Sequence, residues 1–431
     1  MKKSKGISNQ MDMLNGSIFD KILLFALPLA ISSILQQLFN SVDVAVVGRF
    51  ASSEALAAVG SNSSVISLLI NLFVGISVGA NVVIANYIGQ GKTEKIQDAV
   101  HTVMIVSLIS GVFLLVLGLM IARPILEIMG TPENVIDLAV LYLHIYFLGM
   151  PFLMIYNFGA AVLRSKGDTK RPLYCLIISG VINACLNLLF VIVFKLSVAG
   201  VAIATVIADG VSAVLIIYFL MNEEETIRLR LNKLKIKKSE LIKVIKIGVP
   251  AGLQGVVFSV SNVCIQTAIN SFGSDVIAGY SAAIKLNTFA ITSFSTLGNA
   301  MSSYTAQNTG ARKLLRIPEG LKAGIVMLIV VSLPFFIAYF VFPNTMMNIF
   351  VKSSETGIID VGRIFLKIVT PFYFVISAKL TFDGILRGAG RMRAFMASTF
   401  TDLLLRVILA YVFSYALNSE VGIWLSWPVG W

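Results

Sequence analysis

The sequence predicts an all-α polytopic membrane protein with 12 transmembrane helices, arranged as two pseudo-symmetric six-helix bundles whose last helix is truncated. Three observations support this fold class. The 431-residue chain is 57% hydrophobic and only 13% charged, and its mean hydropathy is +0.87, which is far from the values of a soluble domain. Long apolar segments follow one another along the whole chain. The second half of the chain repeats the pattern of the first half.

The repeat has a spacing of about 220 to 223 residues. The recurring pairs are Pro28 with Pro250, Phe50 with Phe272, Pro151 with Pro371, Arg164 with Arg387, and Gly200 with Gly422. We therefore predict an N-terminal six-helix lobe at residues 1–221, a cytoplasmic linker at 222–241 and a C-terminal six-helix lobe at 242–431. Duplicated six-helix halves are typical of transporters, in which two similar bundles move about a site between them.

Each predicted span is a long apolar run between polar turns. The spans cover residues 22–47, 55–86, 96–122, 135–158, 173–194, 198–220, 242–269, 276–306, 319–342, 358–384, 394–417 and 421–431. Most exceed the roughly 20 residues that cross a ~30 Å hydrocarbon core, and runs this long exclude a membrane β-barrel. The final span has about half of the length needed at ~1.5 Å per residue, so the chain is expected to end inside its last helix.

Lysine and arginine are divided unevenly between the two sides of the membrane. Odd and even alternation of the loops places about 24 on the side of the N-terminus and four on the other. This predicts a multi-pass protein of the cell (inner or plasma) membrane with a cytoplasmic N-terminus. The net charge of +12 then reflects topology, and no nucleic-acid partner is expected. The charged stretch 222–246 is interpreted as a solvated connector, with contact to anionic lipid as the alternative.

No pattern in the chain predicts catalysis or nucleotide hydrolysis. Gly91-Lys92-Thr93 is similar to the end of a phosphate-binding loop, but the glycine needed five positions earlier is Asn86. The three cysteines fall inside predicted spans, so they indicate neither a disulfide nor a zinc site. We therefore expect no enzyme activity, no cofactor and no ATPase subunit. The protein is expected to be a monomer surrounded by membrane lipids.

Ionisable residues inside membrane spans are costly unless they are paired or functional. Lys379 with Asp383, and Asp402 with Arg406, lie four residues apart and are predicted to form pairs on a helix face. Asp209 lies in a helix of small residues without an obvious partner. Its role is left open.

A set of polar residues recurs at helical spacing in the N-terminal half. Its members are Gln36, Asn40 and Asp43 on the first span, Asn183 and Asn187 on the fifth, and Thr205 on the sixth. Counting ~1.5 Å per residue puts Asp43, Asn187 and Thr205 at a similar depth, whereas Asn157 falls near the cytoplasmic end of the fourth span. Carboxylate, amide and hydroxyl oxygens suit Na⁺, and the Asp43 carboxylate could instead take a proton. The alternative is a polar network that only joins helices.

Several motifs lie in and around this set. They are Leu38-Phe39-Asn40-Ser41-Val42-Asp43, Val47-Gly48-Arg49, Ala58-Val59-Gly60, Leu163-Arg164-Ser165-Lys166-Gly167-Asp168 with Pro172, and Leu386-Arg387-Gly388. Together they resemble the multidrug and toxic compound extrusion (MATE) family, and the resemblance covers essentially the whole chain. It implies a cation-coupled antiporter that exports small organic compounds, often cationic or amphiphilic, by alternating access of two lobes.

The resemblance also implies roles for single residues. In members with an N-lobe cation site, the matching positions are Asp43, Asn183, Asn187 and Thr205, with Asn40 beside them, so Na⁺ or H⁺ is the expected coupling ion. The family pattern gives Pro28 a helix-bending role. Substrate contacts are expected at Gln36 and Gln254, the latter on the seventh span.

At two points the sequence departs from the family, and these limit which residue roles can be assigned by resemblance. Some members carry an acidic residue at the position of Asn187, so the set here has less negative charge. Others use acidic groups in the seventh and tenth helices, where this chain offers only Gln254 and an Asp383 that lies too near Leu386-Arg387 to match. Coupling is therefore expected in the N-terminal lobe.

Two other classes of protein compete with an exporter. A flippase of lipid-linked precursors from the same superfamily would need a strongly cationic cavity, and the spans that face a cavity offer little beyond Lys285 and Lys379. A membrane-embedded enzyme would need a paired catalytic constellation, which the sequence lacks.

Overall fold

The computed structural model describes residues 13–431, and within this range the chain is helical with no strand. The first helices are α1 (Ile18–Phe50), α2 (Ser53–Gln90), α3 (Thr93–Ile128), α4 (Glu133–Leu148), α5 (Met150–Ser165), α6 (Lys170–Leu188) with a π-helical turn at Leu189–Val193, and α7 (Ser197–Met221). After a 3₁₀ turn at Leu231–Lys233 follow α8 (Lys238–Ile269), a 3₁₀ turn at Asn270–Phe272, α9 (Ser274–Gly310), α10 (Arg316–Phe336) with a π-helical turn at Ile337–Val341, and α11 (Pro343–Met347). The chain ends with α12 (Thr356–Val369), a 3₁₀ turn at Thr370–Phe372, α13 (Tyr373–Gly388), α14 (Met392–Leu417) and α15 (Val421–Gly430).

These helices match the twelve predicted spans in order. Among residues 13–431, eight helices are each long and apolar enough to cross a membrane, and α4 with α5 form a ninth span that is bent by 48°. The three remaining predicted spans correspond to α9, to α12 and α13 on either side of a 3₁₀ turn, and to α15. The prediction of an all-α, multi-pass membrane protein is confirmed.

Contacts divide the chain into two compact units. The first includes Leu27–Leu253 and Ala306–Lys313, and the second includes Ser17–Ala26, Gln254–Thr305 and Leu314–Trp431. Three of these limits fall inside the helices α1, α8 and α9. The lobes predicted at 1–221 and 242–431 describe the sequence repeat, and their boundaries stay a prediction.

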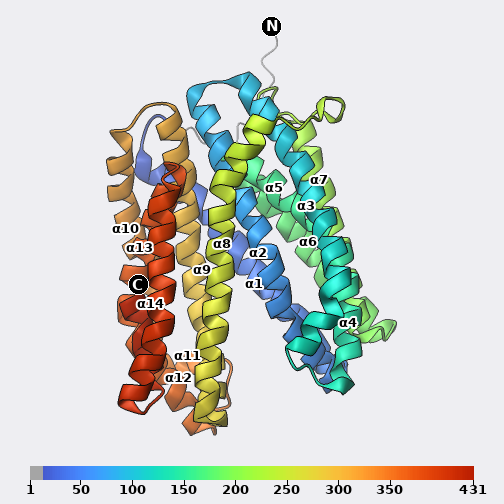
Figure 1. The fold of residues 1–431 in the computed structure, drawn as a ribbon, viewed down its shortest axis with the longest axis vertical. Helices are drawn as coiled ribbons and strands as arrows, with labels where there is room; N and C mark the ends of the chain where they lie inside the picture. Colours follow the sequence, from blue (N-terminus) through green and yellow to red (C-terminus); the bar gives the residue numbers. More distant parts are fainter. Residues whose placement is uncertain (1–12) are drawn as a thin grey trace. The chain divides into compact units, whose positions relative to one another are not determined.

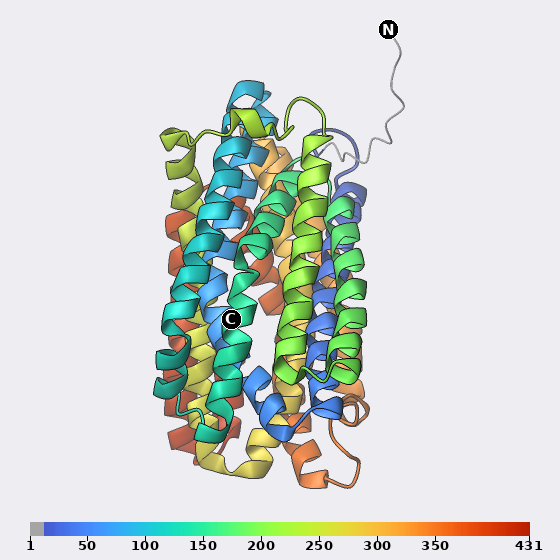
Figure 2. The same cartoon turned by 90° about the vertical axis from the view of Figure 1, so that its right-hand side faces the viewer.

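The first unit is built around the short helix α5. This helix packs on α2, α3 and α7, while α4 packs on α2, α3 and α7, and Figures 1 and 2 show α3, α5, α6 and α7 side by side. Buried apolar side chains such as Leu143, Phe147 and Phe158 fill the space between them. Gly118 of α3 admits the Phe147 ring, since an added Cβ would lie 2.2 Å from the ring atom Cγ.

Two pairs of glycines bring α2 and α8 into backbone contact within the first unit. A Cβ added at Gly75 would lie 2.1 Å from the Cα of Gly252, and one at Gly79 would lie 2.5 Å from the backbone nitrogen of Gly248. Both helices therefore carry small residues four apart, the spacing that permits close approach of membrane helices. Pro250 lies between the two α8 glycines, so this crossing holds the segment in which proline interrupts the helical hydrogen bonds.

An aromatic cluster organises the second unit. Trp424 of α15 stacks on Tyr280 at a centroid distance of 5.2 Å and meets Phe365 edge-on, also at 5.2 Å. Trp427 packs on the same Phe365 at 5.8 Å. Tyr280 lies on α9 and Phe365 on α12, so this cluster ties α15 to both helices. The helix α14 also packs on α15 and on α13, as Figure 1 shows for α13 and α14.

The ionic residues of α13 and α14 pair differently from the prediction in one respect. The expected Lys379–Asp383 ion pair is present at 3.2 Å, but the Lys379 ammonium also contacts Asp402 at 2.8 Å. The predicted pair of Asp402 with Arg406 is wrong. The Arg406 guanidinium instead donates to Asn262 Oδ1 at 3.1 Å and lies over the Trp427 ring at 4.5 Å. A planar guanidinium stacks well on an aromatic face, and a lysine from the neighbouring helix neutralises Asp402.

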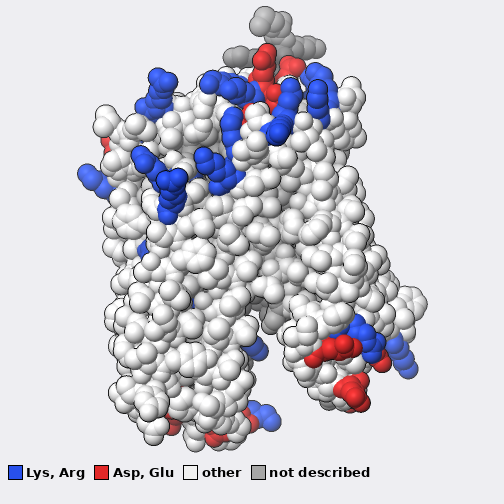
Figure 3. All heavy atoms as spheres, viewed as in Figure 1, with Lys and Arg blue, Asp and Glu red and all other residues white. Residues whose placement is uncertain are grey.

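The segment after α7 is less solvated than the sequence indicates. Ile227 and Leu229 are buried, the Arg230 backbone N–H donates to His101 Nε2 at 3.2 Å, and the Lys237 backbone N–H donates to the Thr102 hydroxyl at 3.0 Å. The connector therefore packs against α3. Figure 3 shows lysine and arginine gathered at this end of the first unit and few charges along its middle.

Glu223 ties this connector to the turn between α5 and α6. Its carboxylate accepts from the Lys166 ammonium at 3.2 Å and from the Arg171 guanidinium. Burial acts to raise the pKa of Glu223, but the backbone N–H of Glu224 and the two cations outweigh it and hold the pKa below its usual value.

Candidate functional site

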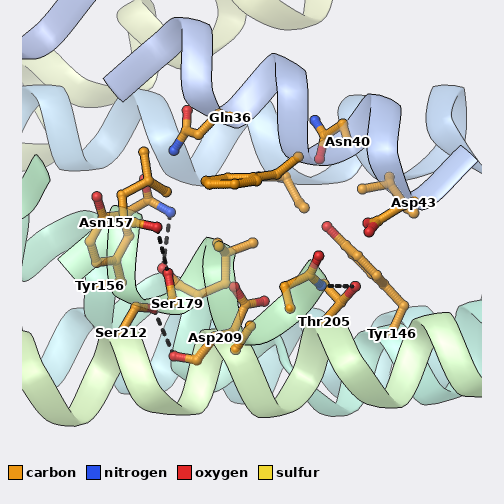
Figure 4. Close-up of a pocket in the computed structure, with 18 of the residues that line it drawn as sticks. Gln36, Asn40, Asp43, Tyr146, Tyr156, Asn157, Ser179, Thr205, Asp209 and Ser212 are labelled. Atoms are coloured by element: carbon orange, nitrogen blue, oxygen red, sulfur yellow. Dashed lines mark hydrogen bonds between the residues drawn. The ribbon is translucent and has the colours of Figure 1, made fainter. Parts of the chain in front are cut away.

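A pocket with a volume of about 390 Å³ lies in the first unit, between α1, α2, α4, α5, α6 and α7 (Figure 4). Its polar lining includes Gln36, Asn40, Asp43, Asn71, Asn157, Ser179, Asn183, Thr205, Asp209 and Ser212, and its aromatic lining is Phe39, Tyr146 and Tyr156. Five of the residues predicted from the sequence line it. A volume of this size is within the range of small-molecule sites.

The four residues predicted to hold a cation are joined by hydrogen bonds. The Asn187 amide donates to Asp43 Oδ1 at 2.5 Å and to Asn183 Oδ1 at 3.1 Å. The Asn183 amide donates to the Thr205 hydroxyl at 3.3 Å, and that hydroxyl donates to the carbonyl of Val201 at 3.0 Å. The side chains of three helices thus form one connected polar chain beside the pocket.

Local sequence explains how the helices bring these groups together. Asn183 and Asn187 lie four residues apart, on one face of α6. One turn before Asn183, Gly180 admits the ring of Phe39, since a Cβ there would lie 1.9 Å from Phe39 Cε2. Phe39 precedes Asp43 by four residues on α1, so this close approach brings the Asp43 face of α1 onto α6.

This arrangement can hold a small cation or a proton. Asp43 is 9% exposed, and its hydrogen-bond partner is the neutral amide of Asn187, which is fully buried. Asn187 Oδ1 is a buried acceptor without a hydrogen-bond partner. Within residues 13–431 no group of three or more His, Cys, Asp or Glu side chains forms a metal site. A cation here would therefore rest on one carboxylate together with amide and hydroxyl oxygens, which are hard ligands.

The other predicted residues lie in different surroundings. Gln36 and Asn40 are on the α1 wall of the pocket (Figure 4). Gln254 belongs to the second unit, where its amide donates to Asp383 Oδ2 at 3.4 Å and to the Thr399 hydroxyl at 3.3 Å. Pro28 lies inside α1, and its carbonyl accepts a bond from the Ser32 hydroxyl at 2.8 Å. The bending role of Pro28 stays a prediction.

Two residues of the pocket wall, Asn157 and Asp209, were not assigned to the site from the sequence. Asn157 was expected near a membrane surface, but it lines the pocket. The predicted span 135–158 is two helices with a bend between Leu148 and Met150, and α5 continues to Ser165, so Asn157 does not lie at the end of its helix. Asp209 also lines the pocket. Its spacing of four residues from Thr205 was the available signal, because the two share a face of α7.

Both halves of the chain are similar to a known protein family. The MatE family model matches residues 28–189 and again residues 250–412. The chain belongs to the MatE family. One family model matching both halves also confirms the duplication, and it begins at Pro28 in the first half and at Pro250 in the second.

Relatives of this MatE chain are similar along nearly its full length. It is 30% identical over 424 residues to the probable multidrug resistance protein YoeA of Bacillus subtilis, covering 96% of this chain and 90% of that protein. Its fold matches the outward-facing conformation of a multidrug resistance MATE family transporter of the MOP superfamily with a TM-score of 0.92 at 23% identity, covering 100% of this chain and 95% of that one.

A second solved structure is nearly as similar in fold. It is a MOP superfamily transporter from Pyrococcus furiosus whose reverse polarity of the binding pocket suggests a different function. The TM-score is 0.91 at 23% identity, covering 100% of this chain and 95% of that one. At this identity the likeness establishes the fold, and the chemistry of the pocket must be argued from the residues of this chain.

Proposed function

We propose that this MatE-family chain is a multidrug exporter, which moves small organic compounds out of the cell in exchange for Na⁺ or H⁺ by alternating access of its two lobes. The observation that carries the proposal is the hydrogen-bonded chain from Asp43 through Asn187 and Asn183 to Thr205 on the wall of a drug-sized pocket. The name of the Bacillus subtilis relative, a probable multidrug resistance protein, supports a role in multidrug resistance.

Asp43 is the proposed coupling residue because it is the one side chain of this hydrogen-bonded set that can change charge. With the coupling ion absent, the carboxylate is anionic and the Asn187 amide donates to it, a charge-assisted bond. A bound Na⁺ or proton neutralises the carboxylate and weakens that bond, so α1 is held less tightly against α6. Pro28 provides the place where α1 bends, since a proline inside a helix removes one backbone hydrogen bond. Gln36 contacts the substrate on α1, and Gln254 does so in the second unit.

The composition of the pocket lining favours export of organic compounds over flipping of lipid-linked precursors. Among the residues that the structure describes, the pocket lining includes the carboxylates of Asp43 and Asp209 and no lysine, arginine or histidine. A lipid-linked phosphate would be repelled by such a lining, whereas a cationic or neutral amphiphile would not.

We place the protein as a monomer in the cell membrane with its N-terminus in the cytoplasm. It needs no ATPase subunit or nucleic-acid partner, and it catalyses no covalent reaction.

The test is transport by the purified chain in liposomes under an imposed Na⁺ or pH gradient. Asp43→Asn is expected to abolish gradient-driven export, because the amide cannot exchange a proton and binds Na⁺ poorly. Insertion and folding should be preserved, since the new side chain has the same shape and can still accept from Asn187.

Asp137→Asn is the matched control. It removes one carboxylate of the same unit whose side chain is 80% exposed and is not among the residues that line the pocket. It should transport like the wild type. Export by the Asp43→Asn protein at the wild-type rate would overturn the coupling proposal.

A further inference from the structure

Asp209 is a second carboxylate in the pocket. It takes no part in the hydrogen bonds that join Asp43, Asn187, Asn183 and Thr205. It lies on α7 one turn beyond Thr205, or ~6 Å along the helix axis, and Figure 4 shows its side chain directed into the pocket between Thr205 and Ser212. The Ser212 hydroxyl donates to the backbone carbonyl of Asp209 at 2.8 Å. Within residues 13–431, its carboxylate oxygens have no hydrogen-bond or ion-pair partner.

The groups around Asp209 do not neutralise it. From the other helices the pocket receives Asp43 on α1, Tyr146 on α4, Tyr156 on α5 and Ser179 on α6. A negative charge inside the protein without a counter-ion is unfavourable, and a cation that enters the pocket relieves it. The lining therefore favours a positively charged ligand.

The aromatic lining restricts the kind of cation further. Phe39, Tyr146 and Tyr156 present rings to the same pocket, and Leu153 and Leu176 add apolar surface. Aromatic faces attract organic cations and also pack against flat apolar bodies. A hydrated metal ion would gain little from such walls, whereas an aromatic cation would use both the rings and the carboxylate.

We propose that Asp209 is the specificity-determining residue that binds the positive charge of an organic substrate, while Asp43 is kept for the coupling ion. This assignment rests on the proposed export function. The substrate class is a monovalent aromatic cation, whose charge lies at Asp209 and whose rings lie against Tyr146 and Tyr156. Because both carboxylates face one pocket, a cation at either site disfavours a cation at the other, and this coupling is reciprocal. Exchange of substrate for ion follows from that repulsion.

Binding of two probes that share a ring system and differ in charge tests the assignment. Ethidium is a monovalent aromatic cation, and phenanthridine is the uncharged ring system from which it is built. Equilibrium dialysis of each probe against the full chain in lipid nanodiscs, with empty nanodiscs as the blank, gives both dissociation constants. Asp209→Asn is expected to weaken ethidium binding at least about tenfold and to change phenanthridine binding by less than about twofold.

Two further variants separate charge from shape. Asp209→Glu keeps the carboxylate and is expected to bind ethidium within about threefold of the wild type. Asp137→Asn removes an exposed carboxylate outside the pocket and should bind both probes as the wild type does. Wild-type ethidium affinity in Asp209→Asn would overturn the assignment. Equal losses of both probes, or a loss in Asp209→Glu as large as in Asp209→Asn, would overturn it as well, because Asp209 would then only shape the pocket.

The failure of this assignment and the failure of the proposed function give different results. If Asp43→Asn abolishes gradient-driven transport and Asp209→Asn binds ethidium normally, export stands and the role of Asp209 is refuted. If Asp209→Asn loses ethidium selectively and Asp43→Asn transports normally, the pocket recognises cations but Asp43 does not couple them.

Discussion

The crossing of α2 and α8 should not tolerate a single added methyl group. A Cβ at Gly75 would lie 2.1 Å from the Gly252 Cα, and ordinary contact begins at 3.4 Å. The helices would have to separate by the difference between 3.4 and 2.1 Å, about 1.3 Å. The neighbouring atoms are backbone of α8, which cannot rotate away as a side chain would. Gly75→Ala is therefore expected to destabilise the first unit by about 1–3 kcal/mol, the usual cost of overpacking, even though alanine favours a helix by roughly 0.5–1 kcal/mol over glycine.

Gly60 supplies a matched control on the same helix. A Cβ added at Gly60 meets nothing within 4 Å, so Gly60→Ala should gain the helix preference of alanine without a clash. Thermal unfolding of the purified proteins in detergent should place Gly75→Ala below the wild type and Gly60→Ala at or above it. The reasoning is refuted if the two variants unfold at the same temperature, or if Gly75→Ala is as stable as the wild type.

Two further predictions concern buried charges. Lys379→Met removes the cation between Asp383 and Asp402, both buried, and should lower the free energy of unfolding by about 3–5 kcal/mol. Adding Asp402→Asn should restore part of this stability, as measured by unfolding in detergent. No gain in stability in the double variant would contradict the pairing. Because the pKa of Glu223 is lowered on folding, its stabilising contribution is complete above the unfolded pKa and is lost as the pH falls through the folded pKa. Glu223→Gln should therefore unfold earlier than the wild type at about pH 7, and the difference should vanish in acid; Glu225→Gln, at a side chain 75% exposed, should show no such pH dependence.

Most of the fold could be predicted because a membrane restricts the choices of the backbone. Every peptide group in lipid must find its partner within the chain, so a long apolar run is a helix. The bend between α4 and α5 shows the limit of that rule. Its local signals are Gly149 and Pro151, but proline at the start of a helix and proline in the middle of one look alike in a hydropathy pattern. The predicted span also ends at residue 158, whereas α5 continues to Ser165, so Asn157 lies well inside its helix and lines the pocket.

The polar chain of Asp43 was predictable for a related reason. Depth along a helix follows from residue counts, and Asp43, Asn187 and Thr205 could be placed at one level before any contact was known. Rotation about the helix axis does not follow from counting alone. The close approach of Phe39 to Gly180 determines that rotation here, and a glycine inside an apolar helix has no distinctive sequence signal.

Charged side chains inside the spans show why partners in space cannot be deduced from spacing. Asp402 and Arg406 lie four apart, yet Lys379 of the neighbouring helix takes the carboxylate and the arginine stacks on Trp427. In sequence, Asp402 has a possible partner four residues away and Asp209 has none, but neither actual environment could be deduced from that difference. The structure separates them, because one meets a lysine and the other meets a pocket lined by rings. A charge inside a membrane span that is left without a partner is costly, so its retention at Asp209 is explained if a substrate cation that binds and leaves compensates it during transport.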